Sequence, residues 1–159
     1  VVTVAGELCT PEDVLARDAR EHGIFSPWYV PRNLYYANVG LPVLHTITSE
    51  GHKGWHLRPN RMGTGIWWTT PLLLWVFVEL RRICREPGDR KLLLGAALAY
   101  AALLFYHSTG YQQAGFNRFS LDYVPALLAL VAPACCVGWR RWVSLAMVGW
   151  SVFYFRWLI

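Results

Sequence analysis

The sequence predicts an all-α fold, a polytopic membrane protein with about four transmembrane helices preceded by an extracytoplasmic segment of short helices. Composition is the first reason, because 55% of the residues are apolar and only 16% are charged, compared with about 45–50% and about 25% in typical soluble proteins. The nine tryptophans are the second, since aromatic rings collect at membrane surfaces. The third is a change near residue 62, which separates a polar, extracytoplasmic or interfacial segment (1–61) from a transmembrane domain (62–159).

A helix is predicted to begin directly after Thr10. Thr10 offers a hydroxyl N-cap, Pro11 suits the first helical position, and Glu12 and Asp13 place acids at the positive end of the helix dipole. Gly23 predicts the end of this helix. Because the helix is mostly charged, we interpret it as a solvated connector.

The next stretch, Phe25–Gly40, is rich in tryptophan and tyrosine, whose rings carry polar tips. Pro31 predicts the start of a second short helix. Such a helix suits the membrane surface or the mouth of a cavity between spans. An aromatic core strip in a small extramembrane domain fits the same residues, and the sequence leaves these alternatives open.

Three histidines follow, at positions 45, 52 and 56, and an HxxxH spacing would place two imidazoles on one face of a helix. Gly51 and Gly54 argue against a helix there. The four cysteines have no metal-type spacing, and we interpret them as packing residues. The sequence therefore predicts no metal site and no cofactor.

Four apolar runs make up the rest of the chain, and the predicted spans are 62–80, 92–111, 123–139 and 142–159. Pro71 interrupts the first span, after two threonines whose hydroxyls could bond the freed backbone groups. In the second span, Gly95 and its neighbouring alanines offer a small-residue face for close helix contact.

The basic residues are concentrated in the connectors between these runs. Five of the fifteen lie in Arg81–Lys91, and Arg140 and Arg141 form a second cluster, whereas the 107–122 turn holds only Arg118. This alternation predicts that the two basic connectors are cytoplasmic and that the turn and the amino-terminal segment lie outside. The net charge of +5 is thereby explained without a nucleic-acid partner, and the predicted location is a bacterial inner membrane.

Arg118 and Asp122 lie where the polar turn enters the third span, four residues apart and on one face if a helix begins by Phe119. One interpretation is that Asp122 caps or charges the helix start while Arg118 reaches a lipid phosphate. The other is that Arg118, with Tyr111, Gln113 and Asp122, forms a site for the phosphate of a lipid-linked donor, because a guanidinium matches phosphate geometry.

Four features occur in order along residues 16 to 139. They are FSPWYVPRNLYY, then LRPNRMGTGIWWTTPLLLW, then a basic connector with a small-residue span, and finally GYQQAGFNRFSLDYVPALLALVAP. This succession resembles the carboxy-terminal part of bacterial multi-spanning glycosyltransferases of the C superfamily. The resemblance implies transfer of a sugar from a polyprenyl-phosphate donor at the outer face of the membrane.

The same resemblance implies that the catalytic carboxylate belongs to a first outer loop near the amino terminus of the full protein. Glu7, Glu12 and Asp13 do not replace it, because they are interpreted as loop and helix-cap residues. We therefore expect the catalytic residue to be supplied by an amino-terminal part of a longer chain. The alternative function is a non-catalytic membrane scaffold, an assembly partner or a piece of a transporter.

Overall fold

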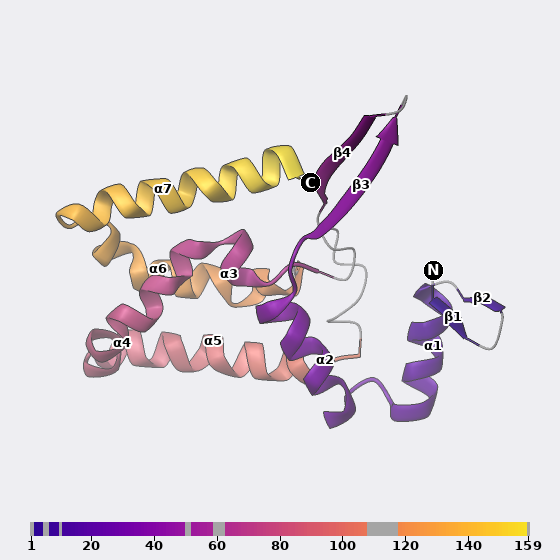
Figure 1. Ribbon diagram of the computed structural model, residues 1–159. Coiled ribbons are helices and arrows are strands. Elements are labelled where there is room, and N and C mark those ends of the chain that lie inside the picture. The colour runs from indigo at the N-terminus through magenta and orange to yellow at the C-terminus, as the bar shows by residue number, and fades with distance from the viewer. Residues whose placement is uncertain are drawn as a thin grey trace.

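The computed structural model describes residues 2–4, 7–9, 11–49, 52–58, 63–107 and 118–158, and the side chains within 16–42, 63–107 and 119–156. Helices form the whole packed body (Figure 1), which confirms the predicted helical class. Two antiparallel hairpins are added to it in the amino-terminal part of the chain. These hairpins were not predicted from the sequence.

The amino-terminal segment begins with strands β1 (Val2–Val4) and β2 (Glu7–Cys9), which pair antiparallel. Helix α1 then covers Pro11–His22, and Gly23 follows it with a positive φ of 79°. Glycine adopts this left-handed conformation without a steric penalty. Both predicted ends of this helix are confirmed.

The segment after Gly23 is helical in three consecutive pieces, which confirms a short helix around Pro31. They are η1 (Pro27–Tyr29), α2 (Val30–Leu34) and the π-helical η2 (Tyr35–Val39). Ser26 caps η1, because its hydroxyl accepts a hydrogen bond from the backbone N–H of Trp28 at 3.3 Å. The segment turns at Gly40 into the second hairpin.

The second hairpin consists of β3 (Val43–Ser49) and β4 (His52–Arg58), paired so that His45 lies opposite His56. It projects away from the helical body (Figure 1). The β-branched residues Val43, Thr46, Ile47 and Thr48 in VLHTITS favour a strand. His52 and His56 therefore belong to a strand, in agreement with the expectation that they are not helical.

The helical body starts at α3 (Ile66–Thr69) and η3 (Pro71–Leu74), followed by the hairpin of α4 (Trp75–Arg85) and α5 (Pro87–Phe105). After the 108–117 segment, η4 (Arg118–Asp122) leads into α6 (Val124–Cys135). Helix α7 (Trp139–Phe153) continues as the π-helical η5 (Tyr154–Leu158).

The first predicted span, 62–80, is not one helix, and this prediction needs correction. Thr70 leaves the helical conformation, with φ −139° and ψ 67°, in keeping with the steric clash by which a following proline disfavours the α region. The break separates α3 from η3, and α4 then continues beyond the predicted end to Arg85. Thr69 bonds back across the turn, from its hydroxyl to the carbonyl of Ile66 at 3.3 Å.

The other three predicted spans each coincide with a helix whose bounds differ. Helix α5 begins earlier than 92 and ends at Phe105 rather than 111, and α6 ends at Cys135 rather than 139. The segment 142–159 begins one turn inside α7. Within the described parts of the chain, no helix combines the length and the apolar character that crossing a membrane requires.

Two clusters of buried side chains hold the body together. One joins α3, η3, α5 and α6 through Ile66, Leu73, Ala96, Tyr123 and Val124. The other joins α4 to α6 through Trp75, Val76, Ile83, Leu130 and Val131. Helix α7 is attached by polar contacts as well, since the Trp75 indole donates to the Ser144 hydroxyl at 3.0 Å and the Trp150 indole donates to the Trp68 carbonyl at 2.7 Å.

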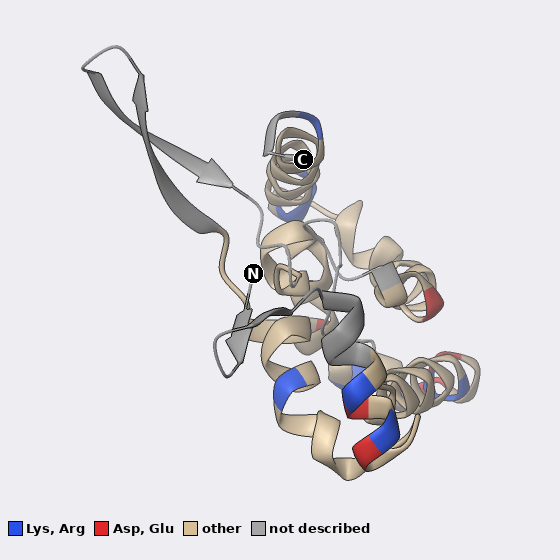
Figure 2. Ribbon diagram, turned by 90° about the vertical axis from the view of Figure 1, so that its right-hand side faces the viewer, with Lys and Arg blue, Asp and Glu red and all other residues tan. Residues whose placement is uncertain are grey.

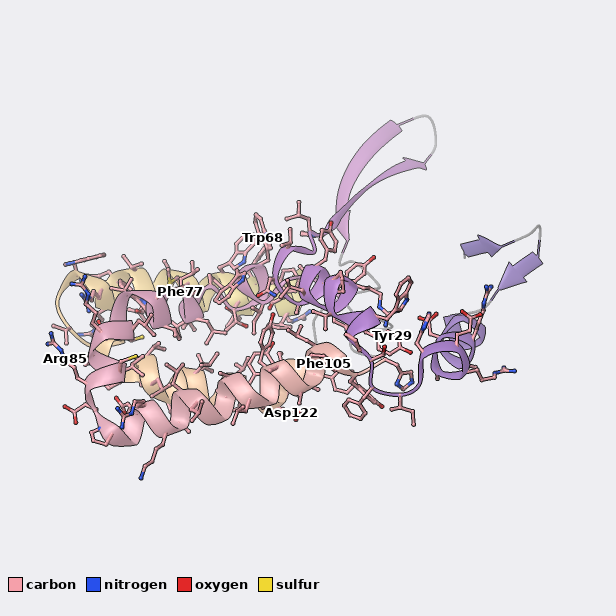
Figure 3. The ribbon with its side chains drawn as sticks, turned by 90° about the horizontal axis from the view of Figure 1, so that it is seen from below. Tyr29, Trp68, Phe77, Arg85, Phe105 and Asp122 are labelled. Atoms are coloured by element: carbon pink, nitrogen blue, oxygen red, sulfur yellow. The ribbon has the colours of Figure 1, made fainter. Side chains whose placement is uncertain are left out.

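The two basic connectors meet at one end of the body. Glu79 accepts from Arg82 at 2.8 Å and from Arg140 at 2.6 Å, which ties the α4–α5 connector to the start of α7. Arg82 also pairs with Asp89 at 2.7 Å and donates to the carbonyl of Leu130 at 2.6 Å. In Figure 3 Arg85 marks this end, and Phe105 and Asp122 lie toward the other.

Charged residues also gather at the end of the body opposite the basic connectors. In Figure 2 charged positions gather on α1 and α2, close to the viewer, whereas the helical shafts are mostly tan. Many large apolar side chains on these shafts are exposed, among them Phe77, Leu94, Leu98, Trp142 and Val152. The buried core therefore contains only some of the apolar side chains of this body.

Candidate functional site

The candidate site lies at the end of the body opposite the basic connectors. Here the residues before α2 run antiparallel to the end of α5. The amide of Ser26 donates to the Phe105 carbonyl at 3.0 Å, and the amide of His107 donates to the Ile24 carbonyl at 3.0 Å. This backbone pairing holds the amino-terminal segment against the chain that leads into residues 108–122.

Asn33 joins α2 to the carboxyl end of α5. Its side-chain amide, fully buried, donates to the carbonyls of Leu104 and Tyr106, both at 2.8 Å. These carbonyls belong to the last turn of α5 and the residue after it, where helices leave acceptors without partners. One side chain therefore satisfies the helix end and fixes α2 on it.

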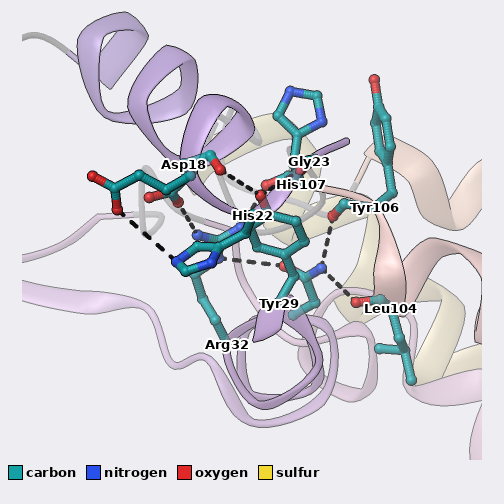
Figure 4. A network of polar contacts seen from close by, with 10 residues as sticks. Asp18, His22, Gly23, Tyr29, Arg32, Leu104, Tyr106 and His107 are labelled. Atoms are coloured by element: carbon teal, nitrogen blue, oxygen red, sulfur yellow. Dashed lines mark hydrogen bonds and ion pairs between the residues drawn. The ribbon is translucent and has the colours of Figure 1, made fainter. Parts of the chain in front are cut away.

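Arg32 links three parts of the chain (Figure 4). Its guanidinium pairs with the carboxylate of Asp18 in α1 at 2.7 Å and donates to the backbone carbonyl of His107. The guanidinium also lies over the Tyr29 ring, 5.0 Å from the centroid. Both charged side chains are about four-fifths buried, with 21% and 20% exposed, so the pair is shielded more than an ordinary surface ion pair.

Tyr29, whose ring lies against the Arg32 guanidinium, completes this network. Its hydroxyl lies 2.7 Å from the Gly23 carbonyl and 2.9 Å from the Asp18 carbonyl, so one proton is shared between two acceptors. Burial raises the pKa of the Tyr29 hydroxyl above its ordinary value of 10.0; the Asp18 carboxylate acts in the same direction and Arg32 opposes it. The hydroxyl is therefore a permanent donor at neutral pH.

The predicted pair Arg118 and Asp122 lies at this end of the body, within η4. The predicted shared face of the two side chains stays a prediction, because the side chain of Arg118 lies outside the described residues. Asp122 is exposed. The N-cap of α6 is Tyr123, and no side-chain cap bond is present there.

The other predicted site residues, Tyr111 and Gln113, lie outside the described residues, and so does the side chain of Arg118. The polar residues that do meet at this end are Asp18, Arg32, Asn33 and His107. Sequence reasoning missed them because Asp18 and Arg32 are fourteen residues apart and belong to different helices. Only the aromatic run after Phe25 and the short helix predicted at Pro31 pointed to this segment.

Two buried polar atoms at this end have no hydrogen-bond partner among the described residues. They are Nδ1 of His107 and the hydroxyl of Tyr123. Buried polar groups are normally satisfied by protein, water or a ligand. His107 directly precedes the 108–117 segment, which lies outside the described residues.

Metal-binding chemistry finds no support in the described residues, which contain no cluster of three or more histidine, cysteine or acidic side chains. His45, His52 and His56 lie in the second hairpin. Their side chains are outside the described set.

Comparison with known proteins adds no constraint on this site. No protein-family model, no curated protein and no solved structure matches the chain.

Proposed function

We propose that this chain is the membrane-embedded helical part of a glycosyltransferase-like protein, and that the protein moves a sugar from a polyprenyl-phosphate donor at the extracytoplasmic face. The observation that carries the proposal is a body with two different ends. One end gathers the basic connectors, and at the other end the amino-terminal segment pairs with Phe105 and His107 at the end of α5.

Support for membrane embedding comes from the exposed apolar side chains of the shafts. Phe77 of α4, Leu98 of α5 and Trp142 of α7 are exposed by 61%, 62% and 69%. Exposed apolar patches of large size mark contact with lipid or with another protein. The broken sequence α3–η3–α4 is compatible with this environment, because non-helical backbone is tolerated in membranes where neighbouring helices cover it.

Support for the sidedness comes from the ion-pair network around Glu79, which unites the two basic connectors. Basic connectors are retained on the cytoplasmic side. The opposite end, with α1, α2 and η4, would then face the outside, where lipid-linked sugars are used. This is the orientation that the distribution of arginine and lysine in the sequence predicts.

The proposed role of Arg118 is to bind the donor phosphate, with Tyr111, Gln113 and Asp122 shaping the surroundings. Arg32 is not proposed for this role, because its guanidinium is already bonded to Asp18 and to the His107 carbonyl. Arg32 and Asn33 act as positioning residues, which hold the start of the 107–122 turn. The catalytic carboxylate would come from outside this chain.

The test is binding of polyprenyl phosphate to the solubilised protein. We expect Arg118→Ala to weaken binding about tenfold or more, because hydrogen bonds to a charged group are worth about 1.5–3 kcal/mol. Arg17→Ala is the matched control, since Arg17 lies on the exposed face of α1 and is 61% exposed. Unchanged affinity in Arg118→Ala, with normal insertion and abundance, removes Arg118 from the site.

A second candidate function is a non-catalytic scaffold or assembly partner. It is favoured by the structural use of Asp18, Arg32 and Asn33, which hold chain segments together rather than surround an open cavity. The two functions differ in one measurement. A scaffold shows no saturable binding of polyprenyl phosphate in the unmodified protein, whereas a transferase does.

A further inference from the structure

A groove opens on the side of the body near the basic end, between the end of α6, the first three turns of α7 and η3. Its volume is 430 Å³, within the range of small-molecule sites, about 300–1,000 Å³. It is lined by Leu72, Cys135, Cys136, Arg141, Ser144, Leu145 and Val148.

The wall of the groove is apolar along most of its length. Leu145 and Val148 come from successive turns of α7, and Leu72 faces them from η3. Two polar groups of the wall are already bonded: the Ser144 hydroxyl accepts from Trp75, and the Cys135 thiol donates to the Val131 carbonyl at 3.3 Å. The wall therefore favours hydrocarbon over a polar ligand.

One end of the groove is cationic. Arg141 lies in the first turn of α7 and is exposed, and no acidic partner is recorded for it among the described residues. The neighbouring Arg140, in contrast, is paired with Glu79. The N-cap of α7 is Gly138 without a side-chain cap, so the first amides of the helix add to the positive potential beside Arg141.

We propose that this groove binds one molecule of an anionic phospholipid, with its phosphate on Arg141 and part of one acyl chain along Leu72, Leu145 and Val148. Charge complementarity and the apolar wall argue for an amphiphile of this kind. From Arg141 to Val148 the helix rises about 10 Å, so headgroup and chain segment fit the groove in one orientation. Basic pockets between helices on the cytoplasmic side bind anionic headgroups in this way.

The inference rests on the membrane embedding in the proposed function, but not on the sugar-transfer activity. At the basic end, the phosphate would lie at the cytoplasmic surface and the chain would point toward the bilayer interior. This end is opposite to η4, which contains Arg118 and Asp122. Binding in the groove would fasten α7 to the body, since α7 exposes much of its apolar surface.

The experiment measures binding of phosphatidylglycerol to the solubilised protein by native mass spectrometry, with phosphatidylcholine as the uncharged comparison. We expect the unmodified protein to retain phosphatidylglycerol preferentially. Arg141→Ala should reduce this retention about fivefold, the effect of one basic residue near an anionic surface. Val148→Trp should also reduce it, because the larger side chain fills the groove.

Matched controls separate the groove from the general surface. Arg90→Ala removes a cation from the same end, and Val78→Trp enlarges an exposed valine on α4; neither residue lines the groove, and both variants should bind phosphatidylglycerol as the unmodified protein does. Equal losses in the Arg90 and Arg141 variants would reduce the effect to bulk charge and overturn the proposal. Retention in Val148→Trp would overturn the proposed chain position.

The two lipid sites are distinguished by exchanging the variants. Arg118→Ala should leave phosphatidylglycerol binding unchanged, and Arg141→Ala should leave polyprenyl phosphate binding unchanged. Loss of both lipids in both variants contradicts separate sites. Glycerol phosphate that displaces phosphatidylglycerol at equal concentration would show that the acyl chain contributes nothing, and this outcome also overturns the proposal.

Discussion

At the scale of single residues, a few buried polar side chains decide how the amino-terminal segment meets the helical body. Asn33 and Tyr29 are fully buried, and the Tyr29 hydroxyl and the Asn33 side-chain nitrogen both donate to backbone carbonyls. Such bonds are specific because carbonyl positions are fixed by the fold. Leaving a buried acceptor without a donor costs about 1–3 kcal/mol. These positions are therefore the ones where small chemical changes have the largest effects.

We expect Asn33→Leu to lower the free energy of unfolding by about 2 kcal/mol, because the carbonyls of Leu104 and Tyr106 lose their shared donor. The measurement is thermal or denaturant unfolding in detergent. The control is Leu34→Ala, since the neighbouring Leu34 is 46% exposed and should change stability much less. Equal stability of Asn33→Leu and the unmodified protein contradicts the capping role.

Tyr29 gives a prediction about alkaline pH. Because the folded-state pKa of Tyr29 is raised above 10.0, its contribution to stability is fully present below the unfolded value and is lost as pH rises through the folded value. Tyr29→Phe keeps the ring under Arg32 but has no group to ionise. Its free energy of unfolding should therefore fall less than that of the unmodified protein between about pH 8 and about pH 11.

Both proteins are unfolded with denaturant at each pH. They share every tyrosine except Tyr29, so a difference between their pH curves reports on Tyr29. At neutral pH, Tyr29→Phe should be the less stable protein by about 1 kcal/mol, because two carbonyls lose their donor. Parallel pH curves for the two proteins would show that Tyr29 does not ionise differently in the folded state.

At the scale of elements, the start of α3 lies directly against the end of η2. The amide of Gly65 donates to the Gly40 carbonyl at 2.7 Å. A Cβ at Gly40 would come within 2.8 Å of the Gly63 carbonyl oxygen, and a Cβ at Gly65 would overlap the backbone carbonyl of Asn38. The two segments can approach this closely only because both positions are glycine.

We expect Gly65→Ala to destabilise the protein by about 1–3 kcal/mol, because backbone must shift to admit the methyl group. Gly95→Ala is the matched control. A Cβ at Gly95 meets nothing within 4 Å, and alanine in a helix interior is favoured over glycine by about 1 kcal/mol. The two substitutions should therefore shift the melting temperature in opposite directions. A loss of stability in Gly95→Ala would contradict the open surroundings of α5 there.

At the scale of the whole molecule, the body has an apolar exterior between two polar ends. Its interior clusters account for Leu73, Ile83 and Val131, which are buried, whereas Leu98 and Trp142 remain largely exposed. The ion pairs around Glu79 lie at one end and the Arg32 network lies at the other. This pattern is the physical basis of the proposed membrane location.

Cysteine labelling tests this two-ended arrangement. In a variant whose only cysteine is Cys84, which is exposed beside the basic connector, an impermeant maleimide should react only from the cytoplasmic side. In a variant whose only cysteine is introduced by Arg17→Cys, it should react only from outside. Both sites reacting from the same side would contradict the proposed orientation, whatever the function.

For two features, the break before Pro71 and the small-residue face around Gly95, the sequence predicted the feature but not its detailed geometry. The break before Pro71 was visible as a proline within an apolar run, but its consequence, a separate α3 and η3, depends on how Thr70 and its neighbours pack. The face of Gly95 was expected to contact a helix, and only part of this expectation is met. Ala96 and Ala99 pack against the core, whereas Gly95 faces open space.

By itself, the sequence determined the helical class, the helix from Pro11 to Gly23 and the separation of basic from apolar stretches, because caps, prolines and charge act over a few residues. Only the tertiary structure decided that Arg32 would meet Asp18 and His107, that Asn33 would cap α5, and that Glu79 would join the two basic connectors. Each of these contacts joins different elements, and their geometry follows from packing rather than from spacing along the chain.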